Sequence, residues 1–168
     1  MACGKTTFGR ALARETGRQF IDLDFYIEQR YRRTVSQLFA ERGEEAFREI
    51  ERNMLREAGE FEDVIISCGG GTPCFFDNID YMLSRGTTVW LQASPERITA
   101  RLVANSARRP LMAGKSPDEI RSAVDAGLAA RHPYYSRAKI HFSGEELEDR
   151  RQISQTVEKF LGIPGVFC

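Results

Sequence analysis

A Gly-Lys-Thr triplet opens the first predicted helix, and this feature constrains the fold more than any other. Gly4-Lys5-Thr6-Thr7 leads into residues 5–16, where Phe8 and Leu12 recur at helical spacing. The triplet matches the second half of a phosphate-binding loop, GxxxxGK[ST], in which backbone N–H groups cradle phosphates, lysine adds a positive charge and the hydroxyl binds Mg²⁺. The helix dipole also favours an anion there. We expect a nucleotide to be bound by Cys3, Gly4, Lys5, Thr6 and Thr7.

The beginning of this loop pattern is missing from the sequence. Counting back from Gly4, the first glycine of the pattern would lie two positions before Met1, and the strand that normally leads into such a loop is absent as well. We therefore expect that the start was mis-assigned or that the sequence is trimmed. An intact-mass measurement on protein made from the natural gene tests this, since a chain that begins at Met1 would contradict it. We also expect the tail, residues 162–168, to cover core that a missing strand leaves exposed.

Charge balance and cysteine spacing exclude several classes of protein. The 168 residues contain 24 basic and 24 acidic side chains, so no overall charge favours nucleic acid or an anionic membrane as a partner. No apolar run approaches the ~20 residues that a membrane-spanning helix needs. The cysteines lack zinc or redox spacing and indicate reduced cytoplasmic thiols: Cys3, Cys68, Cys74 and Cys168. We expect one cytoplasmic, monomeric domain over residues 1–168.

Helical and strand patterns alternate along the chain. Apolar runs predict strands over residues 19–24, 64–68, 87–91 and 139–142, and periodicity and capping signals predict helices over residues 5–16, 25–31, 34–42, 44–58, 77–85, 95–103, 116–131 and 149–161. Pro133 ends one of these helices near Arg131, because it disfavours a helical His132. The alternation predicts an α/β fold with a parallel sheet covered on both faces. Residues 104–115 carry three positive charges without apolar periodicity and predict a mobile basic loop.

Two aspartates follow the apolar part of the first predicted strand. Alternation along an extended chain puts Asp22 and Asp24 on one side, at the carboxyl end of the strand, where open α/β sheets bind ligands. Neighbouring carboxylates in different environments can take different roles in catalysis. The alternative is a polar strand end that caps the next helix. Three glycines, residues 69–71, follow the next strand and suit either a close approach of the backbone to a ligand or a plain turn.

Two arginines have ordinary explanations when taken alone. Arg48 lies at helical pairing distance from Glu44 and Glu51, and an exposed ion pair of this kind contributes only ~0.3–0.5 kcal/mol. Arg131 near the end of a helix is a cation that the helix dipole favours. Without further information, the ion pair is the favoured interpretation of Arg48.

In series, these motifs resemble the shikimate kinase family. The resemblance rests on segments in that family's order and spacing: Gly4-Lys5-Thr6-Thr7, Asp22-Leu23-Asp24, Gly43-Glu44 with Phe47-Arg48 and Glu51, Gly69-Gly70-Gly71, Arg109-Pro110-Leu111 and Arg131-His132-Pro133-Tyr134-Tyr135. It implies the three-layer α/β P-loop fold of nucleoside monophosphate kinases, with five parallel strands and a lid over about residues 104–116. The implied activity, with ATP as co-substrate and Mg²⁺, phosphorylates the 3-hydroxyl of shikimate, a step of aromatic amino acid biosynthesis.

The resemblance also implies roles for individual residues. Lys5 and Arg109 would contact the transferring phosphates, while Arg101 would lie against the adenine. Mg²⁺ would bind Thr6 directly and Asp22 through water. Asp24 would bind the acceptor hydroxyl and accept its proton, or chiefly orient it. The shikimate carboxylate would be held by Arg48 and Arg131, with Glu51 orienting Arg48, and further acceptor contacts would come from Gly69, Gly70 and Gly71.

Three alternatives remain open. Another small-molecule kinase on the same scaffold could phosphorylate gluconate or a nucleoside monophosphate. A monophosphate acceptor would call for more arginines, however, and a neutral polyol would leave the two carboxylate-binding arginines without a purpose. The incomplete loop also leaves room for a nucleotide-binding module without turnover. Coupled ADP release with shikimate, gluconate and AMP would separate these possibilities.

Overall fold

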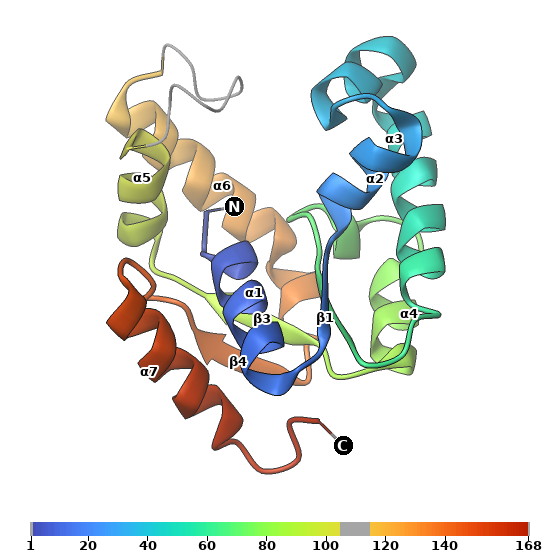
Figure 1. The fold of residues 1–168 in the computed structure, drawn as a ribbon. Helices are drawn as coiled ribbons and strands as arrows, with labels where there is room; N and C mark the ends of the chain where they lie inside the picture. The colour runs from blue at the N-terminus through green and yellow to red at the C-terminus, as the bar shows by residue number, and fades with distance from the viewer. Residues whose placement is uncertain (1, 105–114, 168) are drawn as a thin grey trace.

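The structure is a computed structural model that describes residues 2–104 and 115–167 (Figure 1). Within these ranges the helices are α1 (Lys5–Thr16), α2 (Leu23–Tyr31), α3 (Val35–Ala58), α4 (Asn78–Arg85), α5 (Pro95–Ala104), α6 (Pro117–Tyr135) and α7 (Arg150–Leu161), with a short 3₁₀ helix, η1 (Thr72–Cys74). The strands are β1 (Gln19–Asp22), β2 (Val64–Ser67), β3 (Val89–Gln92) and β4 (Ile140–Ser143). Alternating helices and parallel strands confirm the α/β class that the sequence predicts.

The strands form two separate parallel pairs. β1 pairs with β2, with Gln19 opposite Val64, and β3 pairs with β4, with Val89 opposite Ile140. Helix α1 packs against both β2 and α7, and Figure 1 shows it in front of the strands. Glycine at position 9 allows the close packing of α1, because a Cβ there would lie 2.7 Å from the ring of Phe20.

Apolar clusters on both faces of the strands hold the layers together. Leu23, Ile27, Phe47 and neighbouring residues pack α2 and α3 against β1 and β2. Phe8 of α1 packs against Phe142 and Phe160, with ring centroids 5.7 and 5.2 Å away, which joins α1, β4 and α7. A third cluster joins α5 and α6: Ile98, Leu102, Ile120 and Val124.

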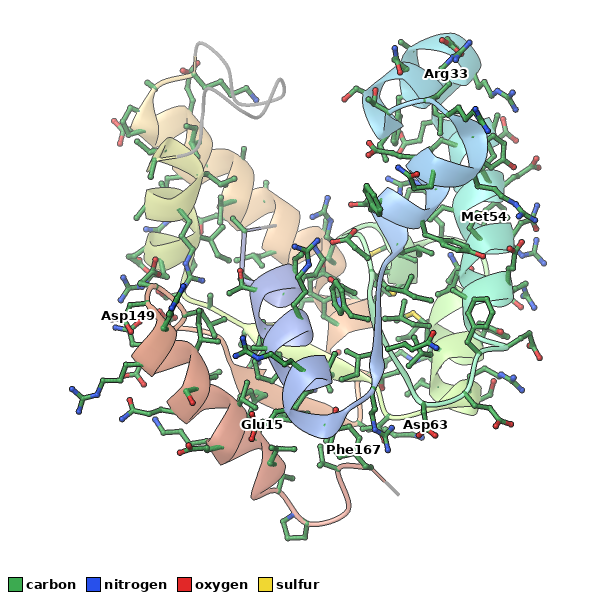
Figure 2. All side chains as sticks on the ribbon, viewed as in Figure 1. Glu15, Arg33, Met54, Asp63, Asp149 and Phe167 are labelled. Atoms are coloured by element: carbon green, nitrogen blue, oxygen red, sulfur yellow. The ribbon has the colours of Figure 1, made fainter. Side chains whose placement is uncertain are left out.

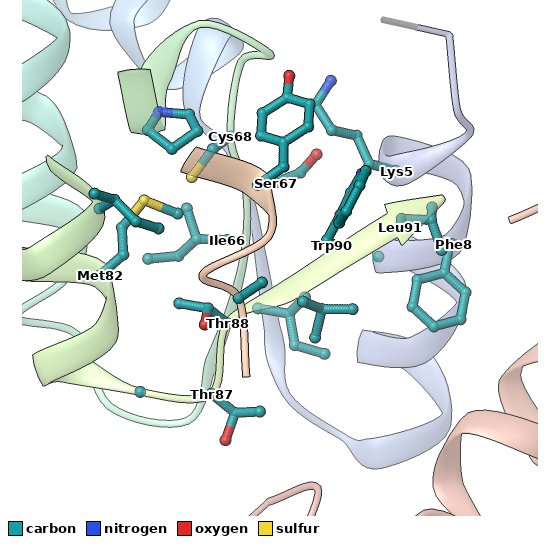
Figure 3. A pocket seen from close by; sticks show the side chains of 18 of the residues that line it. Lys5, Phe8, Ile66, Ser67, Cys68, Met82, Thr87, Thr88, Trp90 and Leu91 are labelled. Atoms are coloured by element: carbon teal, nitrogen blue, oxygen red, sulfur yellow. The ribbon is translucent and has the colours of Figure 1, made fainter. Parts of the chain in front are cut away.

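A cavity of about 1170 Å³ separates the two strand pairs (Figure 3). Its lining includes β2 and β3, with α1 on one face and residues of α4 and α6 on the other. Figure 3 shows Lys5, Ser67 and Trp90 toward one end and Thr87 and Thr88 toward the other. The cavity therefore runs along the strands, and its end near Lys5 meets the phosphate-binding loop.

The carboxyl-terminal tail closes the far end of this cavity. Val166 is buried in the cluster around Phe8, and both Val166 and Phe167 line the cavity. The Arg18 guanidinium lies 4.3 Å from the centre of the Phe167 ring and 3.5 Å from Asp63, which holds the tail at the amino end of β2. Figure 2 shows Phe167 and Asp63 at this same end. This position agrees with the expectation that the tail covers core between the strands.

Most predicted boundaries agree with the structure, but two need correction. The first strand ends at Asp22, so Asp24 lies in the first turn of α2 rather than on the strand. Helix α6 continues through Pro133 to Tyr135, beyond the predicted end at Arg131. The rings of His132 and Tyr135 pack against Trp90, at 5.6 and 5.7 Å between centroids, and this packing offsets the hydrogen bond that proline cannot donate.

Part of the predicted lid lies outside the described residues. The lid was assigned to about residues 104–116, and residues 105–114, with Arg109 among them, are not described. Helices α5 and α6 flank this segment. The role of Arg109 therefore stays a prediction from the sequence.

Candidate active site

The phosphate-binding loop and the first strand meet through a direct hydrogen bond. Gly4 is the N-cap of α1, which begins at Lys5. The Thr6 hydroxyl donates to Asp22 Oδ2 at 2.8 Å, while Asp22 Oδ1 accepts from the Phe25 N–H at 3.4 Å and so caps α2. The capping alternative for Asp22 is therefore realised, and the other oxygen of this carboxylate still faces the loop.

Asp24 lies among charges that have opposite effects on it. Burial raises the pKa of the Asp24 carboxyl above its ordinary value, the positive charge of Lys5 opposes this shift, and the carboxylates of Asp22 and Glu51 add to it. These influences indicate that Lys5, Asp22 and Asp24 belong to one site. A carboxylate that is easier to protonate than usual can hold and accept a proton from an alcohol.

The glycine triplet leaves room for the neighbouring functional side chains. A Cβ at Gly69 would lie 3.1 Å from Asp24 Oδ1. A Cβ at Gly71 would lie 2.8 Å from both terminal nitrogens of Arg48, so only glycine lets this guanidinium sit against the backbone. Between them, the Gly70 carbonyl accepts a hydrogen bond from the Tyr135 hydroxyl at 2.6 Å.

Arg48 is held on several sides. Its Nη1 donates to Glu51 Oε2 at 2.8 Å, and its Nη2 donates to Glu44 Oε1 at 3.1 Å. The guanidinium also lies over the rings of Phe75 and Phe47, at 4.1 and 5.4 Å from their centres. The ion pairs expected from the helical spacing are therefore present. With only 13% of its side chain exposed, Arg48 is more deeply buried than the arginine of a surface ion pair.

Arg131 reaches the same region from α6. Burial raises the pKa of the Cys74 thiol, while the charges of Arg131 and Arg48 both act in the opposite direction. Both guanidiniums therefore lie close enough to Cys74 to affect it. Burial likewise raises the pKa of Tyr135, and the charge of Arg131 again opposes the shift. Both charges therefore act near the glycine triplet, and the assignment of the two arginines to one carboxylate stays a prediction.

Arg101 packs beside the phosphate-binding loop. It donates to the Gly144 and Glu145 carbonyls at 3.1 and 3.0 Å and forms an ion pair with Glu148 at 2.7 Å, while its Nη1 lies 3.4 Å from the Ala2 carbonyl. The assigned adenine contact is untested, but these bonds fix Arg101 against the turn between β4 and α7.

The large cavity does not enclose the whole site. Its lining includes Cys3, Lys5, Gly69 and Gly70, but not Asp24, Arg48 or Arg131. Asp24 and Arg48, which lie beside the glycine triplet, are therefore outside the cavity. Burial raises the pKa of the Cys68 thiol on its wall to about 12, which agrees with an unreactive buried thiol.

Among the described residues, no cluster of three or more His, Cys, Asp or Glu side chains forms a metal site. Thr6 and Asp22 nevertheless present adjacent hard oxygen donors. This small donor set fits Mg²⁺, which usually keeps several waters and binds substrate phosphates as well. It would not suit a metal that needs a complete protein shell.

The structure also reveals site residues that sequence analysis did not assign. Thr72, Cys74 and Tyr135 all contact the glycine triplet or the side chains around it. Tyr135 belongs to a quoted motif, and Thr72 follows the triplet directly. The contact of Cys74 with Gly70 is local, but those of Thr72 with Glu51 and of Tyr135 with Gly70 span 21 and 65 positions, so no local spacing indicates them.

Comparisons with known proteins agree on one family. The sequence model of the shikimate kinase family matches residues 1–162. A shikimate kinase of Phocaeicola vulgatus is 53% identical over 158 residues, which cover 94% of this chain and 90% of that protein.

No helix among the residues that the structure describes combines the length and apolar character needed to span a membrane.

Solved structures give the same result. The crystal structure of shikimate kinase from Bacteroides thetaiotaomicron has a TM-score of 0.92 at 48% identity and covers 95% of this chain and 90% of its own. Shikimate kinase from Acinetobacter baumannii, solved in complex with shikimate, has a TM-score of 0.82 at 28% identity, over 96% of this chain and 86% of its own. The two likenesses show that the fold extends over nearly all of this chain.

Proposed function

Because this chain belongs to the shikimate kinase family and is an ATP-dependent kinase, we propose that it transfers the γ-phosphate of ATP to the 3-hydroxyl of shikimate at the site around Lys5 and Asp24. The observation that carries this assignment is that Asp24 and Arg48 lie against the glycine triplet while the charge of Lys5 acts on Asp24. The shikimate bound to the Acinetobacter baumannii relative supports the choice of acceptor.

The nucleotide half of the reaction rests on α1 and Asp22. The amino end of α1 and the Lys5 ammonium bind the ATP phosphates, and Thr7 lies in the same first turn. Thr6 would hold Mg²⁺ directly, and Asp22 would hold it through water. When bound, Mg²⁺ neutralises charge on the phosphate oxygens. Arg109, which lies outside the described residues, adds a second cation over the transferring group by similarity to the family.

The acceptor half of the reaction rests on Asp24 and the two arginines. Asp24 orients the hydroxyl and takes up its proton, while Arg48 and Arg131 grip the carboxylate of the acceptor. Gly69, Gly70 and Gly71 let the ring approach the backbone. We propose a monomeric enzyme, and the cysteine spacing, which is typical of reduced thiols, supports a cytoplasmic one.

One set of assays tests the proposed reaction. Coupled ADP release is measured with shikimate, gluconate and AMP as acceptors under the same conditions. We expect turnover with shikimate alone. Turnover with gluconate or AMP but not shikimate would assign a different kinase, and ATP binding without any turnover would leave a nucleotide-binding module.

Replacing Arg48 with alanine tests the carboxylate-binding arginines. Loss of charge-assisted bonds to a carboxylate should raise the KM for shikimate about 10- to 100-fold, with a much smaller effect on the KM for ATP. Arg42→Ala, a change of an exposed arginine on the same helix, is the matched control. An unchanged KM for shikimate in the Arg48 variant would remove Arg48 from acceptor binding.

Replacing Asp22 with asparagine tests the metal assignment. Asparagine keeps one oxygen that can accept from the Phe25 N–H, and its amide nitrogen can donate to the Thr6 hydroxyl, but the negative charge is removed. The Mg²⁺ concentration that gives half-maximal rate should therefore rise severalfold, while circular dichroism shows a normal fold. The same Mg²⁺ dependence in both proteins would show that Asp22 does not help to hold the ion.

A further inference from the structure

A buried carboxylate connects Arg48 to the end of the glycine triplet. Glu51 has only 2% of its side chain exposed. Its Oε2 accepts from Arg48 Nη1 at 2.8 Å, and its Oε1 accepts from the Thr72 hydroxyl at 2.6 Å. A carboxylate at this depth requires partners for both oxygens. One partner comes from α3 and the other from η1, so the Glu51 carboxylate links these two elements.

Thr72 is itself firmly held. The residue has no exposed surface, and its carbonyl accepts from the Asn78 side chain at 2.8 Å. Its N–H donates a hydrogen bond to the Gly69 carbonyl at 3.2 Å. The Thr72 hydroxyl therefore has a fixed position relative to the glycine triplet. Because it binds Glu51, it also fixes the carboxylate that holds Arg48.

We propose that Thr72 is a positioning residue for acceptor binding: its hydroxyl occupies one oxygen of Glu51, so that the other oxygen holds the Arg48 guanidinium in place for the acceptor carboxylate. This proposal rests on the proposed function of Arg48. The close approach at Gly71 shows how little freedom the arrangement has, because the terminal nitrogens of Arg48 would be 2.8 Å from a Cβ at that position.

The two acidic partners of Arg48 differ in a way that suits this role. Glu51 is buried and fixed, whereas 60% of the Glu44 side chain is exposed. Glu44 accepts from Nη2 and Nε of Arg48, at 3.1 and 3.4 Å. These two nitrogens form one edge of the guanidinium, whereas Glu51 binds Nη1 on the other side. An acceptor carboxylate can displace the exposed Glu44 from that edge while Glu51 keeps its bond. Without the Thr72 hydroxyl, Oε1 of Glu51 would lack a partner and would accept a hydrogen bond from Arg48 instead. The guanidinium would then rotate.

The test replaces Thr72 with valine, which keeps the shape of the side chain but cannot donate a hydrogen bond. We expect the KM for shikimate to rise about tenfold, and kcat and the KM for ATP to stay within about twofold. Thr72→Ser, which restores a hydroxyl, should return the KM for shikimate close to the original value. A defect of packing alone would not be repaired by serine, because serine is smaller.

Thr156→Val is the matched control. Thr156 is also buried, and its hydroxyl donates to the Glu146 carbonyl at 2.8 Å, but it lies on α7, which contributes no residue to the acceptor site. This variant loses an equivalent buried hydrogen bond and should lower Tm without changing the KM for shikimate. A similar rise of that KM in both variants would show a general effect of destabilisation and overturn the proposal.

A double-mutant cycle makes the test independent of how well each variant folds. In the Arg48→Ala background, Thr72→Val should cause no further rise in the KM for shikimate, because the side chain that Thr72 positions is gone. Additive effects would overturn the proposal, as would an unchanged KM in Thr72→Val alone. If Thr72→Val does not fold, Thr72→Ala enters the same cycle. Failure of the proposed function is distinguishable, since the unmodified protein would then show no turnover that depends on shikimate.

Discussion

Asp24 illustrates at the residue scale how a buried carboxylate costs stability. Burial and the nearby carboxylates raise its pKa above the ordinary 3.8, so the folded protein binds this proton more tightly than the unfolded chain does. The stability that this tighter proton binding adds to the folded state is therefore fully present below pH 3.8, and it is lost as the pH rises through the raised pKa. At neutral pH the ionised Asp24 opposes folding.

Replacing Asp24 with asparagine should accordingly separate stability from activity. The metal-free variant should melt at a higher temperature than the original protein at pH 7, and the difference should shrink as the pH is lowered toward 4. Turnover should fall by about 10²- to 10⁴-fold while ATP binding persists. Thermal melts in EDTA and coupled assays measure the two effects.

Asp63→Asn provides the comparison for this prediction. Asp63 is 82% exposed and forms a long ion pair with Arg18, so its charge contributes little to stability. Its replacement should change neither turnover nor the dependence of Tm on pH. A lower Tm for Asp24→Asn at neutral pH, or near-normal turnover, would contradict the environment described for Asp24.

Single residues also show where sequence analysis reaches its limit. The helical spacing of Arg48, Glu44 and Glu51 predicts their ion pairs, and the structure contains both. The bond between Thr72 and Glu51 joins residues 21 positions apart, so no local pattern could indicate it. Local spacing identifies partners on one helix, whereas partners on different elements require the fold.

At the scale of whole elements, local chemistry decides most boundaries. The capping boxes at Thr34 and Ser116 start α3 and α6 as predicted, because each hydroxyl bonds to the backbone three residues further on. The predictions failed where tertiary packing overrides such signals. Pro133 stays helical because its neighbours pack on Trp90, and β1 stops at Asp22 because the carboxylate caps α2.

The break at Gly43 gives a test at this scale. Gly43 has φ +79° inside α3, a backbone conformation that side chains rarely adopt, although no atom would contact an added Cβ within 4 Å. Gly43→Ala should therefore lower the free energy of unfolding by about 1–2 kcal/mol through backbone strain alone. Urea unfolding measures the change.

Gly86→Ala is the matched control for the break in α3. Gly86 is equally open, but its φ of −176° is extended backbone that alanine adopts without strain. Its replacement should be close to neutral. Equal losses in both variants would mean that the sign of φ at Gly43 does not matter. The positive φ of Gly43 would then not explain why α3 is interrupted at this residue.

At the scale of the molecule, the two strand pairs leave strand edges that face each other across the cavity. The Thr88 carbonyl accepts a hydrogen bond from β4, the Gln92 carbonyl accepts one from Gly144 directly after β4, and the Asp63 carbonyl accepts one from β1. Since backbone groups alternate between the two edges of a parallel strand, the peptide groups of Ile66 and Leu91 point into the cavity. Buried peptide groups without partners are costly, and both faces of the cavity are mostly apolar.

An added strand should therefore fit between β2 and β3 and stabilise the protein. Cys3 lines the cavity at the carboxyl end of the strands, so a strand joined ahead of Met1 could run parallel to them. Because both faces are covered, its sequence should be an apolar run rather than an alternation. A fusion that places five valine or isoleucine residues and a short glycine turn before Met1 should raise Tm by about 5 °C or more. The same fusion with aspartate at every second position should not.

Amide exchange locates the added strand. The N–H groups of Ile66 and Leu91 should exchange much more slowly in the apolar fusion, because they gain partners. Those of Ile65 and Trp90, which face β1 and β4, should change little, since the existing ladders already protect them. The fluorescence of Trp90, the only tryptophan in the chain, should shift as water leaves the cavity. A higher Tm without this alternation in protection would mean that the added residues bind elsewhere, whereas an unchanged Tm would mean that the facing edges do not accept a strand.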